Sequence, residues 1–426
     1  MKKKLLSTAL AFVATAVLAS CGNQEEAFKP ALDTETKCSI KIIGSYDSFE
    51  ALEAEFDRFN AYYPRVTLQY EKKDDYNNTL ANALDANDKP NIFFSYTWMN
   101  GNEKYASVVE HMEELSNSAL KINLDCIRPG IINRDAEKKV HMVPIFSRTY
   151  GALVNNDLFK KEGISVPSTW KDLLVTCKAF SDKGYASPMM GFSLNSSSCW
   201  MNTVAYPMFV ADLAKNPDAL DRANKLDPTA GEYMRNALTT VDQLTKKGCI
   251  DGTECDKIAD NYKKVLLRFF EGDVPMMICT GDTVSGTPKR EKESQAFIDS
   301  PFNYSFYPIP VTEKGGYFID SPSIQFSVNK YCDNLDMTNE FMRFLVSNKE
   351  LNNMASIKRL GAPTKVMSSD PIYAPFGNVP TERTFSPEAL GVKDSLAAEI
   401  RTAAFKVGKG QLTIDEAIAM YGHLNQ

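Results

Sequence analysis

Histidine is scarce in this chain, and the few that occur stand apart from the cysteines. The 426 residues contain three histidines, and none lies at ligand spacing from a cysteine pair, so we expect neither a metal site nor a cofactor. The G-x-S-x-G and H-E-x-x-H motifs are absent, as is a phosphate-cradling glycine loop. The chain therefore gives no sign of the common hydrolase or nucleotide chemistries, and we expect a protein that is not an enzyme.

Long apolar runs and blocks of like charge are also rare. The one marked apolar run, Leu5 to Val17, is too short to cross a bilayer comfortably. The net charge of −6 is spread over the chain without a basic patch, which argues against a nucleic-acid partner. With 43% apolar residues and more length than one core usually serves, the chain is expected to fold as two globular lobes.

The first twenty-one residues have the pattern of an export signal. Lys2, Lys3 and Lys4 precede the apolar run, and Leu18-Ala19-Ser20-Cys21 follows it. This arrangement resembles the lipobox of bacterial lipoproteins, which implies removal of residues 1–20 and a lipid on the Cys21 sulfur. The alternative is an ordinary signal with a chance cysteine. We expect an exported protein, anchored by lipid to the cell membrane on its periplasmic or cell-surface side.

The segment behind Cys21 shows no periodic pattern. Residues 21–37 are polar and are expected to form a tether, whose sixteen residues after Cys21 would span about 20–24 Å on average. Eight further cysteines permit disulfides in an exported chain but do not require them. Cys249 and Cys255 are close enough in sequence to close a small loop.

Strand-like and helix-like segments then alternate. Residues 40–43, 66–70 and 91–94 are predicted strands, while 49–59, 76–84 and 105–115 carry apolar residues at helical spacing. This βαβ rhythm indicates a parallel sheet, in which ligands meet the loops after the carboxyl ends of the strands.

Five motifs in order then resemble one family. They are Pro144 with Gly151-Ala-Leu-Val-Asn155 to Gly163; Pro167 to Leu173; Phe270-Glu-Gly272 to Gly281; Phe341 to Glu350; and Arg401 to Ala417. Together they resemble the sugar-type extracellular solute-binding proteins of ABC importers, the group of the maltose-binding protein. Asp273-Val274-Pro275 and Asp320-Ser321-Pro322 depart from the family pattern near the expected cleft, which leaves the identity of the ligand open.

The resemblance implies an α/β fold of two lobes, each a mainly parallel sheet flanked by helices, with three crossovers between them. We place the first lobe at 38–146 plus 282–347 and the second at 147–281 plus 348–426. Crossovers are expected near Pro144, at 270–281 and at 341–350. The implied partners are a small solute, taken as a carbohydrate, and the permease subunits of the importer, and the chain is expected to act as a monomer.

Sugar recognition needs flat apolar faces for the ring and planar polar groups for its hydroxyls. The loops near the expected cleft offer this mixture, and the candidate ligand-binding residues are Tyr46, Asp47, Tyr96, Trp98, Arg148, Tyr150, Asn195, Trp200 and Asp282. For each there is a structural alternative: the tryptophans could pack in a core, Asp47 could cap a helix, and Arg148 could pair with a carboxylate.

Three other functions remain open from the sequence. The same fold could bind a polyamine, a phosphate ester or a peptide, since Arg148 and the acidic candidates suit charged solutes. An anchored glycoside hydrolase would need two carboxylates about 5–10 Å apart across a cleft. A surface adhesin or structural lipoprotein would have a cleft filled by its own side chains.

Overall fold

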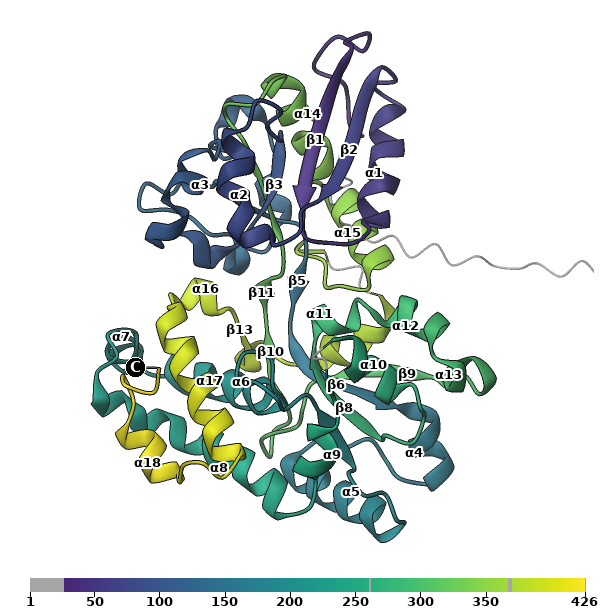
Figure 1. The fold of residues 1–426 in the computed structure, drawn as a ribbon, viewed down its shortest axis with the longest axis vertical. Helices are drawn as coiled ribbons and strands as arrows, with labels where there is room; N and C mark the ends of the chain where they lie inside the picture. Colours follow the sequence, from purple (N-terminus) through teal and green to yellow (C-terminus); the bar gives the residue numbers. More distant parts are fainter. Residues whose placement is uncertain (1–26, 260–261, 367–369, 426) are drawn as a thin grey trace, which may run out of the picture.

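Two sheets divide the chain into two lobes joined by short extended segments (Figure 1). The structure, a computed structural model, describes residues 27–259, 262–366 and 370–425. The predicted signal peptide and the predicted lipid site at Cys21 lie outside these residues. Within them, no helix is both long enough and apolar enough to cross a membrane.

The first lobe is built on a five-stranded sheet in the order β2-β1-β3-β12-β4. The strands are β1 (Cys38–Gly44), β2 (Val66–Lys72), β3 (Ile92–Ser95), β4 (Val143–Pro144) and β12 (Gln325–Val328). Its helices are α1 (Glu50–Asn60), α2 (Tyr76–Asp85), α3 (Ala106–Glu110), α14 (Leu335–Leu345) and α15 (Asn348–Lys358). The apolar residues predicted at helical spacing, such as Leu52 and Phe59, are fully buried in this core.

The second lobe is built on a four-stranded sheet in the order β7-β8-β6-β9. Its strands are β6 (Tyr150–Asn155), β7 (Met189–Gly191), β8 (Met276–Thr280) and β9 (Tyr304–Tyr307). The helices before β8 are α4 (Asn156–Glu162), α5 (Trp170–Asp182), α6 (Trp200–Ala214), α7 (Pro217–Asn224), α8 (Arg235–Lys246), α9 (Gly252–Asp256) and α10 (Lys263–Phe269). Those after β8 are α11 (Gly281–Val284), α12 (Thr287–Glu293), α13 (Gln295–Asp299), α16 (Pro387–Leu390), α17 (Asp394–Gly408) and α18 (Ile414–Ala419).

The predicted two-lobed α/β fold is confirmed, but both sheets are mixed. In the first lobe β1 pairs parallel with β2 and β3, whereas β12 pairs antiparallel with β3 and β4. In the second lobe β7 and β8 are parallel, and β6 is antiparallel to both β8 and β9. The expectation of mainly parallel sheets was therefore wrong. In the first lobe β12 arrives directly from the other lobe, without a βαβ crossover, and so runs against its neighbours.

Among the described residues, membership of the two cores changes at three places. The chain leaves the first core after Phe146 and enters the second by Ala152. It returns from the second core at Ile319 to the first at Ile324. It crosses a last time between Ala362, in the first core, and Ile372, in the second. At the first two places, β5 (Ser147–Arg148) and β11 (Ser321–Pro322) form an antiparallel pair that runs between the lobes (Figure 1). In the second lobe, the short strands β10 (Phe318–Ile319) and β13 (Thr384–Phe385) pair beside this connection.

Two predicted domain boundaries were wrong. Residues 282–319 belong to the second lobe, because β9 completes its sheet and Phe306 and Ile319 lie in its core. Residues 348–362 belong to the first lobe, because α15 packs on α1 and its Leu351 is fully buried there. Correspondingly, the predicted crossover at 270–281 is strand β8 inside the second lobe. The chain crosses instead at 320–323, and again only after Ala362.

Arg128 connects all three crossings. Its Nε and Nη2 donate to the two carboxylate oxygens of Asp320, at 2.6 and 2.7 Å, and Nη2 also donates to Ser147 Oγ at 3.0 Å. Its Nη1 donates to the carbonyl oxygens of Ala362 and Thr364, at 2.7 and 2.8 Å. All five N–H groups of the guanidinium are thus used, so this largely buried charge is fully satisfied.

The predicted tether is shorter than expected, because residues from Phe28 onward are docked on the first lobe. The Phe28 ring lies edge-on to Tyr62 and Phe344, with centroids 5.0 and 5.3 Å away, and the Arg343 guanidinium lies 4.4 Å above it. The backbone N–H of Ala31 donates to Glu340 Oε1 at 2.8 Å. Of the predicted tether, residues 21–26 lie outside the described residues, and 28–32 are part of the lobe.

None of the eight cysteines in the described part of the chain is joined in a disulfide, and six of them are buried. Cys249 and Cys255 therefore do not close the loop that the sequence permits, and buried apolar packing accounts for their positions.

Asp320→Asn should destabilise the protein strongly, because it removes one charge of a buried ion pair and leaves Arg128 uncompensated. We expect a loss on the order of 3 kcal/mol in the free energy of unfolding, measured by urea denaturation. The same substitution in the exposed Lys178–Asp182 pair, Asp182→Asn, is the matched control and should change stability by less than about 0.5 kcal/mol. Equal effects in the two variants would contradict the role given to Arg128.

Candidate ligand-binding cleft

A cavity of about 1040 Å³ lies between the two lobes. It is at the upper end of the usual range for small-molecule sites, about 300–1,000 Å³. The first lobe contributes the segments that follow β1 and β3, and the second contributes α11, α12, α16 and the start of α17. The hinge strands β5 and β11 form its middle. The site therefore lies at the carboxyl ends of strands, as the βαβ pattern predicts.

A pair of stacked aromatic rings lies on the first-lobe wall. Tyr96 and Trp98, on both sides of Thr97 after β3, stack with centroids 5.3 Å apart and planes 9° apart. Tyr105 supports Trp98 edge-on at 5.0 Å. Tyr105, from the next short helical turn, thus helps to fix the pair, which needs little reordering to meet a flat apolar face of a ligand.

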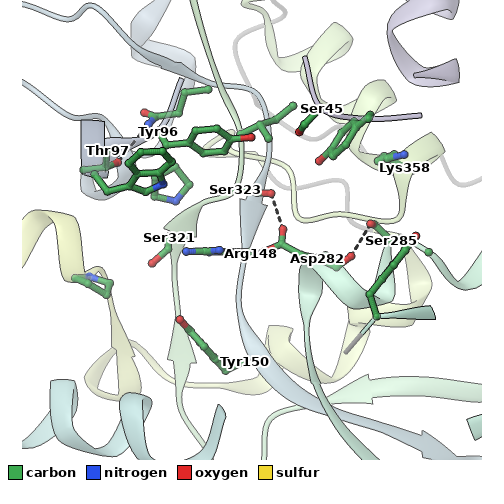
Figure 2. Close-up of a pocket in the computed structure, with 18 of the residues that line it drawn as sticks. Ser45, Tyr96, Thr97, Arg148, Tyr150, Asp282, Ser285, Ser321, Ser323 and Lys358 are labelled. Atoms are coloured by element: carbon green, nitrogen blue, oxygen red, sulfur yellow. Dashed lines mark hydrogen bonds and ion pairs between the residues drawn. The ribbon is translucent and has the colours of Figure 1, made fainter. Parts of the chain in front are cut away.

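Polar groups meet at the hinge in the middle of the cleft. Arg148 Nη1 lies 3.1 Å from Asp282 Oδ2, and Ser323 Oγ donates to Asp282 Oδ1 at 2.6 Å. Figure 2 shows these side chains together, with Tyr150 below them and Tyr96 above. Both members of the ion pair remain about 40% exposed, at 42% and 38% of their side-chain surfaces, so both can still reach a solute.

Tyr46 and Lys358 form another part of the first-lobe wall. Tyr46 packs edge-on to Phe49 and Phe94, at 5.2 and 5.3 Å, and the Lys358 Nζ lies 4.5 Å from the centre of its ring. Asp47 pairs with Lys72 at 2.9 Å, and this hydrogen-bonded partner lowers the pKa of Asp47. Burial lowers the pKa of Lys358.

The second-lobe wall combines carboxylates with unsatisfied polar atoms. Burial raises the pKa of Glu388 to about 7, and burial also raises the pKa of Asp394. Among the described residues, Asn202 Oδ1 and Arg401 Nε are buried without a hydrogen-bond partner, although both residues line the cavity. Buried polar atoms without partners are costly, so these two are positioned to gain from a polar ligand.

Seven of the nine predicted ligand residues line this one cavity: Tyr46, Asp47, Tyr96, Trp98, Arg148, Tyr150 and Asp282. They come from both lobes and the hinge, which the fold brings together from distant parts of the chain. Their contact with a ligand stays a prediction.

Asn195 and Trp200 lie outside the cavity lining, so their assignment was wrong. Trp200 is 1% exposed and starts α6, a helix buried on nearly every side. It packs so closely on β7 that a β-carbon at Gly191 would lie 2.6 Å from the Trp200 Cβ. Asn195 is exposed, and its Oδ1 accepts from the backbone N–H groups of Ser197 and Ser198, which makes it a local turn residue.

Several lining residues gave no sequence signal. Asn202 and Tyr206 lie on α6, a helix that we did not predict from the sequence. Lys358 ends a helix in a segment that we assigned to the wrong lobe. Glu388, Asp394 and Arg401 come from α16 and α17, and of these only Arg401 was noted in the sequence, as the start of a family motif and not as a ligand residue. No group of three or more metal-ligating side chains occurs in the residues that the structure describes.

Comparison with known proteins gives one family and many structures of the same fold. Residues 44–351 match the family described as bacterial extracellular solute-binding protein. The melibiose/raffinose/stachyose-binding protein MelE of Bacillus subtilis is 25% identical over 205 residues, which is 47% of this chain and 46% of that protein, so the match spans about half of the relative's length.

Two solved structures illustrate the likeness of fold. RafE from Streptococcus pneumoniae, in its apo form, aligns with a TM-score of 0.67 and 15% identity, covering 92% of this chain and 98% of that one. A sugar transporter protein from Bacillus licheniformis in complex with stachyose aligns with a TM-score of 0.59 and 16% identity, covering 91% of this chain and all, 100%, of the other.

Glu388→Gln should change how stability depends on pH. The pKa of Glu388 in the folded protein is about 7, above its ordinary value of 4.5. The protonated carboxyl group therefore contributes fully to the free energy of unfolding below pH 4.5, and this contribution is lost as the pH rises through 7. The amide imitates the protonated carboxyl, so the variant should gain in Tm relative to the parent between pH 4.5 and 8. The exposed Glu382→Gln variant should follow the parent across this range. If the curves of Tm against pH for Glu388→Gln and the parent ran parallel, the raised pKa of Glu388 would be contradicted.

Proposed function

Because the chain belongs to the bacterial extracellular solute-binding protein family, we propose that it binds a carbohydrate between its lobes and delivers it to the permease of an ABC importer. Delivery requires only that the loaded form differ in shape from the empty one. A solute that contacts both lobes stabilises the closed arrangement, and the permease recognises that arrangement. The protein itself performs no chemical step.

The observation that carries the proposal is the stacked pair of Tyr96 and Trp98. A pyranose ring presents a flat patch of C–H groups, and a rigid aromatic face is the side-chain surface that matches it best. Across the cavity, Asn202, Glu388 and Arg401 offer the donors and acceptors that ring hydroxyls need. An apolar face on one lobe and hydrogen-bonding groups on the other would make closure depend on the sugar.

The size of the cavity favours an oligosaccharide. About 1040 Å³ is more space than a single hexose requires, and the lining continues over both sides of the hinge. In support, the curated relative is named for melibiose, raffinose and stachyose, and the Bacillus licheniformis protein was solved with stachyose.

Trp98→Ala should weaken sugar binding at least tenfold, equivalent to about 1.4 kcal/mol, because the stacked pair of Tyr96 and Trp98 loses its larger ring. The test is calorimetric titration of the purified protein with the oligosaccharide that raises its Tm most in a panel that includes raffinose and stachyose. Tyr331→Ala removes a half-exposed aromatic ring from the same lobe, outside the cavity lining, and should leave the affinity unchanged.

Two results would count against the proposal. One is a panel without any thermal shift, together with a non-carbohydrate solute extracted from the purified protein. The other is release of reducing ends from a bound oligosaccharide, which would indicate a glycoside hydrolase instead.

The proposal includes anchoring by lipid at Cys21. Cys21→Ser should move the protein from the membrane fraction to the soluble fraction of an expressing bacterium, because serine offers no thiol for acylation. The matched control is Cys38→Ser, a half-buried cysteine of the folded lobe, which should remain with the membrane. An unchanged membrane fraction for Cys21→Ser would exclude the anchor.

A further inference from the structure

The two ends of the cleft differ in charge. Figure 2 places Tyr96 and Thr97 on one side of the hinge residues and Lys358 on the other. In Figure 1, α16 and α17 lie on one side of the strands β5 and β11, and α11 and α12 lie on the other. The cavity therefore has one end between the Tyr96–Trp98 pair and α16–α17, and another between Lys358 and α12; we call these the aromatic end and the lysine end.

The aromatic end is close to balanced in charge. Glu388 and Asp394 are its carboxyl groups, and Lys393 and Arg401 are its cations. With stacked rings, acids, bases and the unsatisfied Asn202 Oδ1, this end suits the neutral hydroxyl-bearing rings of a sugar.

The lysine end carries an excess of positive charge. Lys289 and Lys292 on α12 and Lys358 at the end of α15 line it, and none of the three forms an ion pair with a described residue. The carboxylates there are Asp47 and Glu50. Asp47 pairs with Lys72, and Glu50 accepts the Ser48 hydroxyl at 2.8 Å. Both carboxylates attract Lys358 electrostatically, but neither forms an ion pair with a lysine of the lining. Two carboxylates therefore face three lysines, and this end keeps an excess of positive charge. Arg290, on the same helix, is paired with Glu293.

This excess stands out because the chain as a whole has a net charge of −6. Most lysines of acidic proteins lie on a solvated surface, and in this chain many have a carboxylate partner, as Lys178 has in Asp182. Lys358 differs in two respects: it is half-buried over the Tyr46 ring, and it has no carboxylate partner in the described residues. Burial lowers the pKa of Lys358 even though the charges of Glu50 and Asp47 oppose this, so the ammonium ion lacks an anion in direct contact.

We propose that the lysine end binds an anionic substituent of the solute, so that the solute is an acidic oligosaccharide with an uncharged ring at Tyr96 and Trp98. The inference rests on the proposed function and specifies its substrate class. The shared chemistry is a carboxylate, sulfate or phosphate group on a sugar, held by Lys358 with Lys289 and Lys292 around it. An anion at this position supplies the partner that the half-buried ammonium lacks, and because it contacts α15 of the first lobe and α12 of the second, it also favours closure.

The test compares one neutral oligosaccharide with the same oligosaccharide carrying a terminal uronate, 6-sulfate or 6-phosphate, by calorimetric titration at 50 and 500 mM NaCl. At least one anionic form should bind ten or more times tighter than the neutral form at low salt. The advantage should shrink at high salt, because the interaction is between charges near the surface. The three anionic forms also distinguish which group the site accepts.

Lys358→Met keeps the length and apolar stem of the side chain and removes its charge, so the ratio of anionic to neutral affinity should fall toward one. The double variant Lys289→Gln/Lys292→Gln, on the exposed face of α12, should lower the same ratio and covers the case in which Lys358→Met folds poorly. Lys178→Met, which removes an exposed lysine far from the cavity, should leave both affinities as they are.

The outcomes separate the two proposals. If the neutral sugar binds in a Trp98-dependent way and no anionic form binds more tightly, the inference about charge is wrong and the carbohydrate function stands. If an anionic advantage exists but survives in both lysine variants, the site has been misplaced and the inference is wrong. If no sugar of either kind binds and Trp98→Ala has no effect, both proposals fail.

Discussion

The guanidinium of Arg128 is the point at which the two halves of this protein are held together. The chain passes between the lobes at three places that are far apart in sequence, and one side chain donates hydrogen bonds to all three. Asp320 balances its charge, and the remaining donors are used by Ser147, Ala362 and Thr364. Arg128 belongs to a loop of the first lobe, so the crossings are fixed with respect to that lobe. The proposed closure around a solute would then require bending just beyond these contacts, with the second lobe turning relative to the first.

The sequence predicted the first half of the fold well, because each element there is specified by its own residues. The strand at Ile40–Ile43 and the helix with Leu52 and Phe59 follow directly from apolar spacing. The crossing points were harder, because a strand entering from the other lobe has the same apolar pattern as one that stays. In this way β8 was taken for a crossover, and β9 was assigned to the wrong lobe. Only the pairing partners, which are decided by tertiary contact, show that β9 completes the second sheet.

The same distinction explains which site residues the sequence could find. Side chains that directly follow a strand, such as Tyr46 and Trp98, were found because the end of a strand marks its place in the sheet. Trp200 was selected for its chemistry, but its helix is apolar on almost all faces, so no amphipathic pattern showed which side met the cavity. Lys358 and Glu388 look like ordinary surface residues in sequence. Their significance lies in what surrounds them: an aromatic ring below one, and burial that raises the pKa of the other to about 7.

The docking of Phe28 determines how far the body of the protein can stand from a membrane. Six residues lie between Cys21 and Phe28, and the seven Cα–Cα steps across them cover at most about 25 Å. A lipid on Cys21 would hold the ends of α1 and α14 near the headgroups and leave the first lobe little room to tumble. The first lobe would then stay close to the bilayer while the second lobe moves relative to it. The protein would meet a transporter by two-dimensional diffusion in the membrane plane, in a restricted range of orientations.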